Sequence, residues 1–213
     1  MGKDIAETIK RADRFKVILI GEGILVGFFA GFVVLLYRVA LEFAGEWMKA
    51  IVGFASQNAL SMAVWFAALA LMACIVAALI RFDPMIAGSG IPQVEGEVAG
   101  MLEHKWWRVI IAKFAGGFLC MLGGLALGRE GPSIQLGAMA GKGISKALDR
   151  GKTEEHFLIT CGASAGLAAA FHAPLAGVMF SLEEIHKNLS VSVLISVMTA
   201  SLTGDILCCV VLG

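Results

Sequence analysis

Two short segments rich in glycine and proline interrupt the apolar sequence, and both could bind an anion. Residues 88–92 read GSGIP and residues 128–132 read GREGP. Glycine permits unusual backbone angles, and proline is favoured in the first turn of a helix because its missing N–H would be unpaired there. Both segments are therefore predicted to begin a helix inside the protein.

The start of a helix exposes free N–H groups and a partial positive charge, and so attracts anions. Two such helix starts that converge within a membrane would form an anion site without a full cation, as discontinuous helices do in transporters. Ser89 adds a hydroxyl donor, or serves as an ordinary N-cap. The alternative is that the glycines only allow tight helix packing, which explains one such segment more easily than two.

Glu130 is an unusual residue for an anion site, because its carboxylate would occupy the place that an anion should take. It is a candidate competitor: when charged it blocks the site, and when protonated it leaves. The alternative is an ordinary glutamate at the start of a surface helix. Its position between two apolar runs argues against that alternative.

Lys113 is a lone ammonium within an apolar run. On insertion scales such a charge costs on the order of 2.5–3.5 kcal/mol, so a buried partner is expected. Glu95, which follows the first glycine-rich segment, is the predicted partner in a structural ion pair.

The composition indicates a membrane protein. The 213 residues carry 17 Lys and Arg against 17 Asp and Glu, with 58% hydrophobic and only 16% charged residues. Residues 50–80 contain no charge, a run longer than the ~20 residues that a bilayer helix needs. Composition excludes an ordinary soluble enzyme, a nucleic-acid binder and a disordered chain, and the pattern is not that of a membrane β-barrel. An all-α, polytopic membrane protein remains.

Apolar or helix-like runs predict the membrane helices, and Pro174 divides one of them. In the first run Gly23, Gly27 and Gly31 recur every four residues, which predicts close approach of another helix on that face. The runs cover residues 17–37, 62–80, 109–127, 133–147, 156–182 and 189–212.

Basic residues predict the orientation in the cell membrane. Five Lys or Arg precede the first run, in a segment that we expect to be an amphipathic helix at the membrane surface. Arg81, Lys105 and Arg108 follow the second run. The positive-inside rule then places the N-terminus and residues 81–108 in the cytoplasm of a multi-pass protein.

Neither the cysteines nor the histidines form a recognisable cluster in the sequence. The five cysteines lie in apolar runs without a CxxC pair and are expected to be reduced thiols packed as small hydrophobes. The histidines are scattered, and no nucleophile–base set is evident. We therefore expect no enzyme activity, no metal and no cofactor.

The two segments, together with AAAFHAPLAG at residues 168–177, resemble in order and spacing the signature stretches of the CLC family of chloride channels and proton/chloride antiporters. The resemblance covers nearly the whole chain. It implies that Ser89 coordinates the central anion and that Glu130 is the gate. It also implies that backbone N–H groups around Gly90, Ile91 and Gly131 face the anion path.

The resemblance further implies that Glu184 is an internal proton-transfer residue, which favours an antiporter over a passive channel. The alternative is that Glu184 and its neighbour Glu183 form an ordinary pair of charges at a helix end. Chloride and protons would be the transported ions, and chloride a substrate rather than a cofactor.

Family members are about twice this length and are built from two inverted repeats. We therefore expect a cytoplasmic segment at residues 1–16, the first repeat at 17–188 and the start of the second at 189–213. The chain would be a truncation or one part of a split protein, with the second half as its missing partner.

The resemblance also implies a homodimer, to which the helices around Pro174–Glu184 contribute. A stripe of Leu175, Val178, Met179 and Leu182 would lie at that contact, or else meet lipid. The predicted function is proton-coupled chloride transport. The alternatives are a passive anion channel and a half that is inactive without its partner polypeptide.

Overall fold

The structure, a computed structural model, describes the backbone of residues 2–187 and 190–212, and side chains from Val17 onward within those ranges. Every regular element there is helical, which confirms the predicted all-α class. The elements are α1 (Gly2–Ala55), α2 (Ala59–Phe82), η1 (Pro84–Ile86), α3 (Ile91–Val98), α4 (Trp106–Leu122), α5 (Glu130–Ala147), α6 (Lys152–Phe171), α7 (Pro174–Phe180), η2 (Ser181–His186) and α8 (Val191–Leu212).

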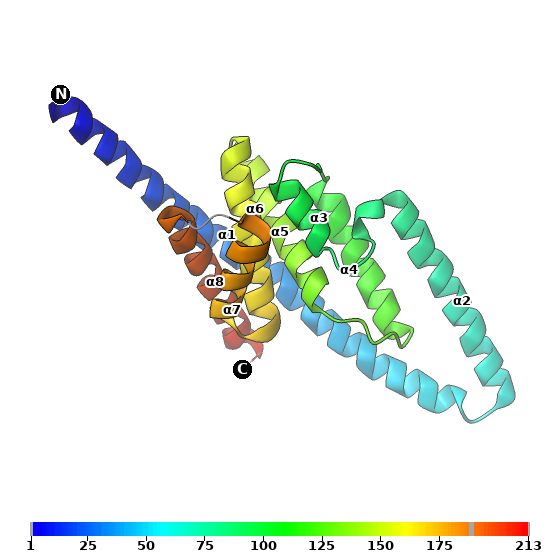
Figure 1. Ribbon diagram of the computed structural model, residues 1–213. Helices are drawn as coiled ribbons and strands as arrows, with labels where there is room; N and C mark the ends of the chain where they lie inside the picture. The colour runs from blue at the N-terminus through cyan, green and yellow to red at the C-terminus, as the bar shows by residue number, and fades with distance from the viewer. Residues whose placement is uncertain (1, 188–189, 213) are drawn as a thin grey trace.

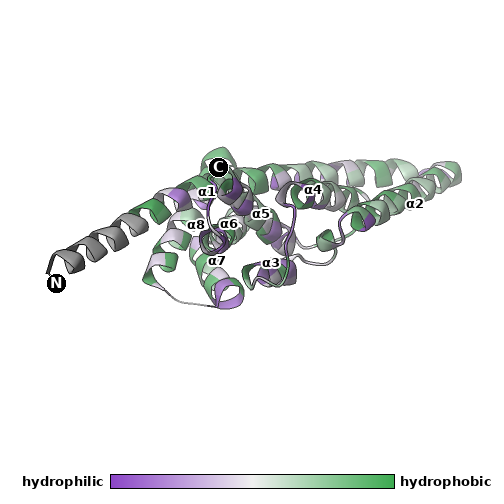
Figure 2. Ribbon diagram, turned by 90° about the horizontal axis from the view of Figure 1, so that it is seen from above, coloured by the Kyte–Doolittle hydropathy of each residue, from purple (hydrophilic) through white to green (hydrophobic). Residues whose placement is uncertain are grey.

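Helices α1 and α2 form a long hairpin that extends from one side of the molecule (Figure 1). Helix α1 is continuous from Gly2 to Ala55, so the backbone does not break at residue 16, where the predicted surface segment ends. Residues 17–55, 59–82 and 191–212 are long and apolar enough to cross a membrane. Apolar residues dominate these helices (Figure 2), as expected for a membrane protein.

Small residues bring the central helices together. The predicted close approach at the glycines of α1 is confirmed, and the helix that approaches is α8. A Cβ at Gly27 would lie 2.8 Å from the Cα of Ala200, and one at Gly31 would lie 2.8 Å from the Cα of Gly204. Glycines of α5 contact α6 in the same way, with the Cα of Gly166 3.0 Å from a Cβ built at Gly137.

Helix α4 ends at Leu122, five residues before the predicted end of its apolar run. Gly124 has a φ of 84°, a left-handed conformation that glycine adopts without strain. The chain then runs without helical structure to Glu130, where α5 begins. The predicted division at Pro174 is confirmed, since α6 ends at Phe171 and α7 begins at the proline.

The predicted stripe on α7 and η2 does not form one contact surface. Val178 and Leu182 are buried in the core between α1, α6 and α8, whereas Leu175 and Met179 are exposed. One edge of the stripe, Val178 and Leu182, thus packs against this chain's own helices, and the other edge, Leu175 and Met179, stays exposed. The prediction that all four residues form a dimer surface is therefore wrong.

Candidate anion site

The first glycine-rich segment ends where α3 begins. Gly90 precedes the helix with a φ of 99°, and a Cβ there would lie 2.5 Å from Oε1 of Gln135 on α5. Both the backbone conformation and the space available therefore require glycine. Pro92 occupies the second position of α3, where its missing N–H leaves no helical hydrogen bond unmade.

The second segment begins α5 and packs against the first. A Cβ at Gly131 would lie 2.8 Å from the carbonyl carbon of Ser89, so any larger residue would push the two segments apart. Glu130 is the first residue of α5 and Pro132 the third. Two helix starts that are 39 residues apart in the sequence thus come into direct contact.

The two helix starts border one pocket of about 500 Å³. Ser89, Ile91, Glu130 and Gly131 all line it, so four of the five predicted anion-binding residues share one space. Oγ of Ser89 accepts a hydrogen bond of 3.3 Å from the backbone N–H of Ile91, which leaves its hydroxyl hydrogen for another acceptor. The lining includes Tyr37, Val76, Ile80, Ile86, Ala87, Gly88, Ala112, Lys113, Gly116, Gly117, Cys120, Leu127, Gly128 and Pro132.

Glu130 also lines a second pocket, of about 350 Å³, together with Leu41, Glu42 and Phe171. Glu130 is exposed at the start of α5. Both pockets are lined by Glu130, Leu127 and Gly128. A side chain in this position can turn from one pocket to the other by rotation about its own bonds.

Lys113 does not pair with Glu95, and the predicted ion pair is wrong. Its Nζ donates hydrogen bonds to the carbonyl oxygens of Ile86, at 2.9 Å, and Gly88, at 2.8 Å. Glu95 instead forms an ion pair with Lys187, and this carboxylate raises the pKa of Lys187. Lys113 has no need of Glu95, because the carbonyl oxygens of the turn before α3 face its ammonium group and accept its hydrogen bonds.

Lys113 therefore changes the expected electrostatics of the pocket. It lines the pocket with only 6% of its surface exposed. The site was predicted to attract anions through helix starts alone, but an ammonium group stands beside them. A cation within a few ångströms of an anion contributes far more in a low-dielectric site than in water.

Glu184 lies on η2, is exposed, and is not among the residues that line the pocket. It contributes to the raised pKa of Lys187, which places its charge close to that lysine. Element η2 contacts α3, the helix whose first residue borders the pocket. Glu184 therefore does not share the pocket that Glu130 borders.

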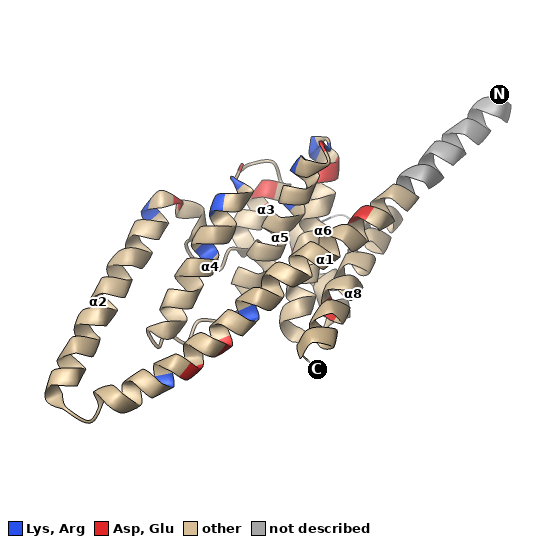
Figure 3. Ribbon diagram, turned by 180° about the vertical axis from the view of Figure 1, so that it is seen from behind, with Lys and Arg blue, Asp and Glu red and all other residues tan. Residues whose placement is uncertain are grey.

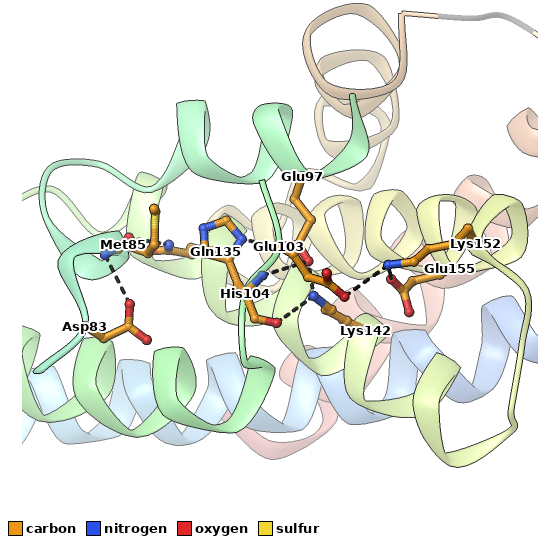
Figure 4. Close-up of polar contacts among 9 residues, drawn as sticks. All are labelled: Asp83, Met85, Glu97, Glu103, His104, Gln135, Lys142, Lys152 and Glu155. Carbon is orange, nitrogen blue, oxygen red and sulfur yellow. Dashed lines mark hydrogen bonds and ion pairs between the residues drawn. The ribbon is translucent and has the colours of Figure 1, made fainter. Parts of the chain in front are cut away.

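A buried ion network near the other end of α3 was not predicted. Nζ of Lys142 on α5 donates to Glu97 and, at 2.6 Å, to the carbonyl oxygen of His104 (Figure 4). Nδ1 of His104 contacts the same carboxylate, and all three side chains are buried. No spacing signal in the sequence marks this network, because its three residues lie 7 to 45 positions apart.

Charged residues elsewhere are distributed as a membrane protein requires. Figure 3 shows Lys, Arg, Asp and Glu mainly near the ends of α3 to α6 and along the second half of α1, with long uncharged stretches between. At one such end Lys152 lies 3.1 Å from Glu103, and this ion pair lowers the pKa of Glu103.

Residues 69–213 match the family described as voltage gated chloride channel, more than half of the chain. The chain belongs to this CLC family. The match confirms the resemblance that the two glycine-rich segments and residues 168–177 indicated, and it includes the residues that line the pocket from α2 to α5.

Relatives named H(+)/Cl(-) exchange transporter ClcA are similar to this CLC chain. The protein of Vibrio cholerae is 39% identical over 198 residues, which cover 88% of this chain and 41% of the relative. That of Cronobacter sakazakii is 42% identical over 176 residues, which cover 78% and 37%. The chain thus spans about two fifths of the length of these relatives.

Solved CLC structures have the same fold. A slow cyanobacterial Cl⁻/H⁺ antiporter superposes with a TM-score of 0.79 at 31% identity, over 92% of this chain and 47% of the other. A CLC-type fluoride/proton antiporter superposes with a TM-score of 0.69 at 23% identity, over 90% and 47%. The second likeness concerns the fold alone.

Proposed function

We propose that this chain forms one anion-facing half of a proton-coupled chloride transporter in the cell membrane. The pocket shared by Ser89 and Glu130 carries the proposal, because both helix starts and a lysine ammonium border it. The names of the ClcA relatives support chloride and protons as the transported ions. The positive-inside rule supports a cytoplasmic N-terminus.

The anion is proposed to bind between the two helix starts. The hydroxyl of Ser89 and the backbone N–H groups of Gly90, Ile91 and Gly131 would donate hydrogen bonds to it. Helix starts favour an anion through their free N–H groups and their dipole. The positive charge of Lys113, which lines the same pocket, would add a Coulombic attraction for the bound anion.

Glu130 is proposed to be the gate. Its carboxylate competes with chloride for the positive end of α5 when it is ionised, and protonation removes the charge that holds it there. Its position between the two pockets supports this proposal, because the side chain has a second space to enter. Proton uptake and anion entry would thus be coupled at one residue.

Glu184 is proposed to deliver protons from the cytoplasm, and its presence favours exchange over a passive CLC channel. The passive channel remains the second candidate function. Because the chain spans about two fifths of its ClcA relatives, the second repeat, a homodimer and any dependence on a partner polypeptide are also part of the proposal.

Bromide binding tests the site. Bromide in a crystal of the chain is expected to give an anomalous diffraction peak in contact with Ser89, and Ser89→Ala should weaken bromide affinity. Ser56→Ala, in the turn after α1, is the matched control and should change nothing. A pocket without bromide at a saturating concentration would contradict the anion site.

Vesicle fluxes test the transport function. Chloride and proton movement would be measured for the chain alone and for the chain reconstituted with the remaining part of a ClcA relative. Opposed, stoichiometric fluxes support the exchanger. Chloride movement without protons identifies the passive channel, and flux only with the added part identifies a half that needs its partner polypeptide.

A further inference from the structure

Three side chains from two helices meet near the end of α6. His172 caps the helix at its C-terminal end, while Asp205 and Cys209 lie one turn apart on α8. Nδ1 of His172 is 3.2 Å from Oδ1 of Asp205 and 3.3 Å from Sγ of Cys209, and the sulfur is 4.0 Å from the same carboxylate oxygen. One nitrogen, one oxygen and one sulfur atom therefore face a common centre.

These separations fit a tetrahedral zinc-class ion. Zinc binds histidine nitrogen and carboxylate oxygen at about 2.0–2.2 Å and thiolate sulfur at about 2.3 Å, so tetrahedral ligand atoms lie roughly 3.3–3.7 Å apart. The three distances bracket that range. A mixed set of imidazole, carboxylate and thiolate suits zinc and cobalt better than magnesium or calcium, which prefer oxygen ligands alone.

The backbone presents these ligands before any ion arrives. His172 adopts a left-handed conformation with φ 54° and ψ 41°, which ends α6 and turns the imidazole toward α8. Asp205 and Cys209 share one face of α8 because residues four apart are neighbours on a helix. The His172 side chain is 37% exposed, so an ion can reach the cluster and a water molecule can complete the tetrahedron.

Arg38 occupies the other side of the histidine ring. Its Nη1 lies 2.7 Å from Nε2 of His172 and 3.2 Å from the carbonyl oxygen of Ala169. A guanidinium can only donate, so Nε2 accepts here and the neutral ring carries its proton on Nδ1. An ion on Nδ1 would require that proton to move to Nε2, and Arg38 would then lose the imidazole as an acceptor and keep the carbonyl oxygen of Ala169.

A second partner for Arg38 is already in place. Its Nε is 4.0 Å from the carboxylate of Glu42, one turn along α1. When an ion binds, Arg38 can move toward Glu42, and its positive charge moves away from the ion. Arg38 is therefore a competitor of the ion for His172.

We propose that His172, Asp205 and Cys209 form a binding site for a divalent zinc-class ion that links the end of α6 to α8. Binding forms one bond from the ion to each of Nδ1, a carboxylate oxygen and Sγ. The thiol proton of Cys209 is released to water, and the imidazole proton moves from Nδ1 to Nε2. The proposal does not depend on the transport function.

Cobalt(II) is the probe, because a tetrahedral thiolate complex of this ion has intense visible absorption. The purified chain is expected to bind one Co²⁺ with a sulfur-to-cobalt charge-transfer band. Cys209→Ser should abolish the band, and His172→Asn should weaken Co²⁺ affinity by at least about 100-fold, since even outer-shell changes cost 10–100-fold. Cys74→Ser, an exposed cysteine on α2, is the matched control and should keep the band.

Arg38→Gln distinguishes a metal site from general damage to the fold. Removing the competing donor and its charge should strengthen Co²⁺ binding by about tenfold or more, whereas mere structural damage would weaken it. A band that survives in Cys209→Ser, or weaker binding in Arg38→Gln with unchanged helicity, would overturn the proposal.

A measurement on the unmodified chain removes any dependence on the folding of variants. Zn²⁺ should slow the reaction of Cys209 with a maleimide, measured by peptide mass spectrometry, while the reaction of Cys74 serves as an internal control. Protection of Cys209 alone supports the site. Equal reaction rates for Cys209 with and without Zn²⁺ would overturn it.

Discussion

The ammonium of Lys113 lies 2.8 Å from the carbonyl oxygen of Gly88, in the same pocket that Glu130 borders. Together with the hydrogen bond from Lys113 to Ile86, this contact fixes the turn that precedes α3. The N–H groups that follow the turn are the proposed anion donors. A lysine on α4 therefore both fixes the geometry of the first helix start and adds positive charge beside it.

Lys113→Met is expected to destabilise the protein and weaken bromide binding. The buried carbonyl of Ile86 and the partly buried carbonyl of Gly88 would lose their donor, and the buried group left unpaired costs about 1–3 kcal/mol. Denaturant unfolding in detergent and bromide titration measure the two effects. Lys49→Met, an exposed lysine at the far end of α1, is the control and should change neither.

The same residue tests the correction to the predicted ion pair. Because Glu95 pairs with Lys187, the effects of Lys113→Met and Glu95→Gln on the free energy of unfolding should add to within about 0.5 kcal/mol. A coupling energy of 1 kcal/mol or more in this double-mutant cycle would restore the Glu95–Lys113 pair.

Glu130→Gln should behave as a permanently protonated gate. The neutral side chain loses its attraction to the start of α5 and leaves the anion position open. Chloride flux in vesicles should persist in the complete assembly, while coupled proton movement disappears. Full proton coupling in this variant would exclude Glu130 as the shared gate.

Glu184→Gln should remove proton coupling and spare chloride movement, because only the internal proton route is lost. Both fluxes are measured in the same vesicles. Glu183→Gln, also exposed on η2, is the matched control and should retain coupling. If both fluxes fall together in Glu184→Gln, the residue has a folding role instead.

Lys142→Met should destabilise the protein strongly. Removing one member of a buried ion pair costs roughly 3–5 kcal/mol, because the carboxylate of Glu97 loses its lysine partner and keeps only His104. The double variant with Glu97→Gln should recover part of that loss. Lys152→Met removes an exposed ammonium that water screens, so it should cost less than Lys142→Met, and a similar loss in both lysine variants would contradict the importance of burial.

Gly27→Ala should separate α1 from α8. The new Cβ would lie 2.8 Å from the Cα of Ala200, closer than packed atoms allow, so stability should fall. Gly21→Ala lies on the same helix with no atom within 4 Å of the new Cβ, and should gain about 0.5–1 kcal/mol from helix propensity. Thermal unfolding in detergent compares the two, and equal effects would rule out the close contact.

The local features of this protein could be predicted from the sequence, because they depend on neighbouring residues. Apolar runs longer than a bilayer helix predict membrane spans, and the glycines and prolines at residues 88–92 and 128–132 predict helix starts. The spacing of Gly23, Gly27 and Gly31 predicted a close helix contact for the same reason, since residues four apart share a helix face. Their partner, α8, could not be predicted, because spacing marks a face but names no neighbour.

The partners of the charged groups were decided by the tertiary structure. Lys113 donates hydrogen bonds to backbone carbonyls. Glu95 pairs with Lys187, and Glu97 pairs with Lys142 and His104. Sequence distance says little about these pairs, since their members lie between 7 and 92 positions apart. A buried charge requires a partner, but the packing of the helices determines which polar group is within reach.

The cluster of His172, Asp205 and Cys209 follows the same rule. In the sequence the histidine lies 33 residues from the aspartate and shows no ligand spacing with it. The end of α6 and the side of α8 bring them within hydrogen-bonding distance. The sequence by itself marked the apolar runs and the two glycine-rich helix starts, since those depend on local chain chemistry. The tertiary structure decided which side chains meet, because that depends on how distant helices pack.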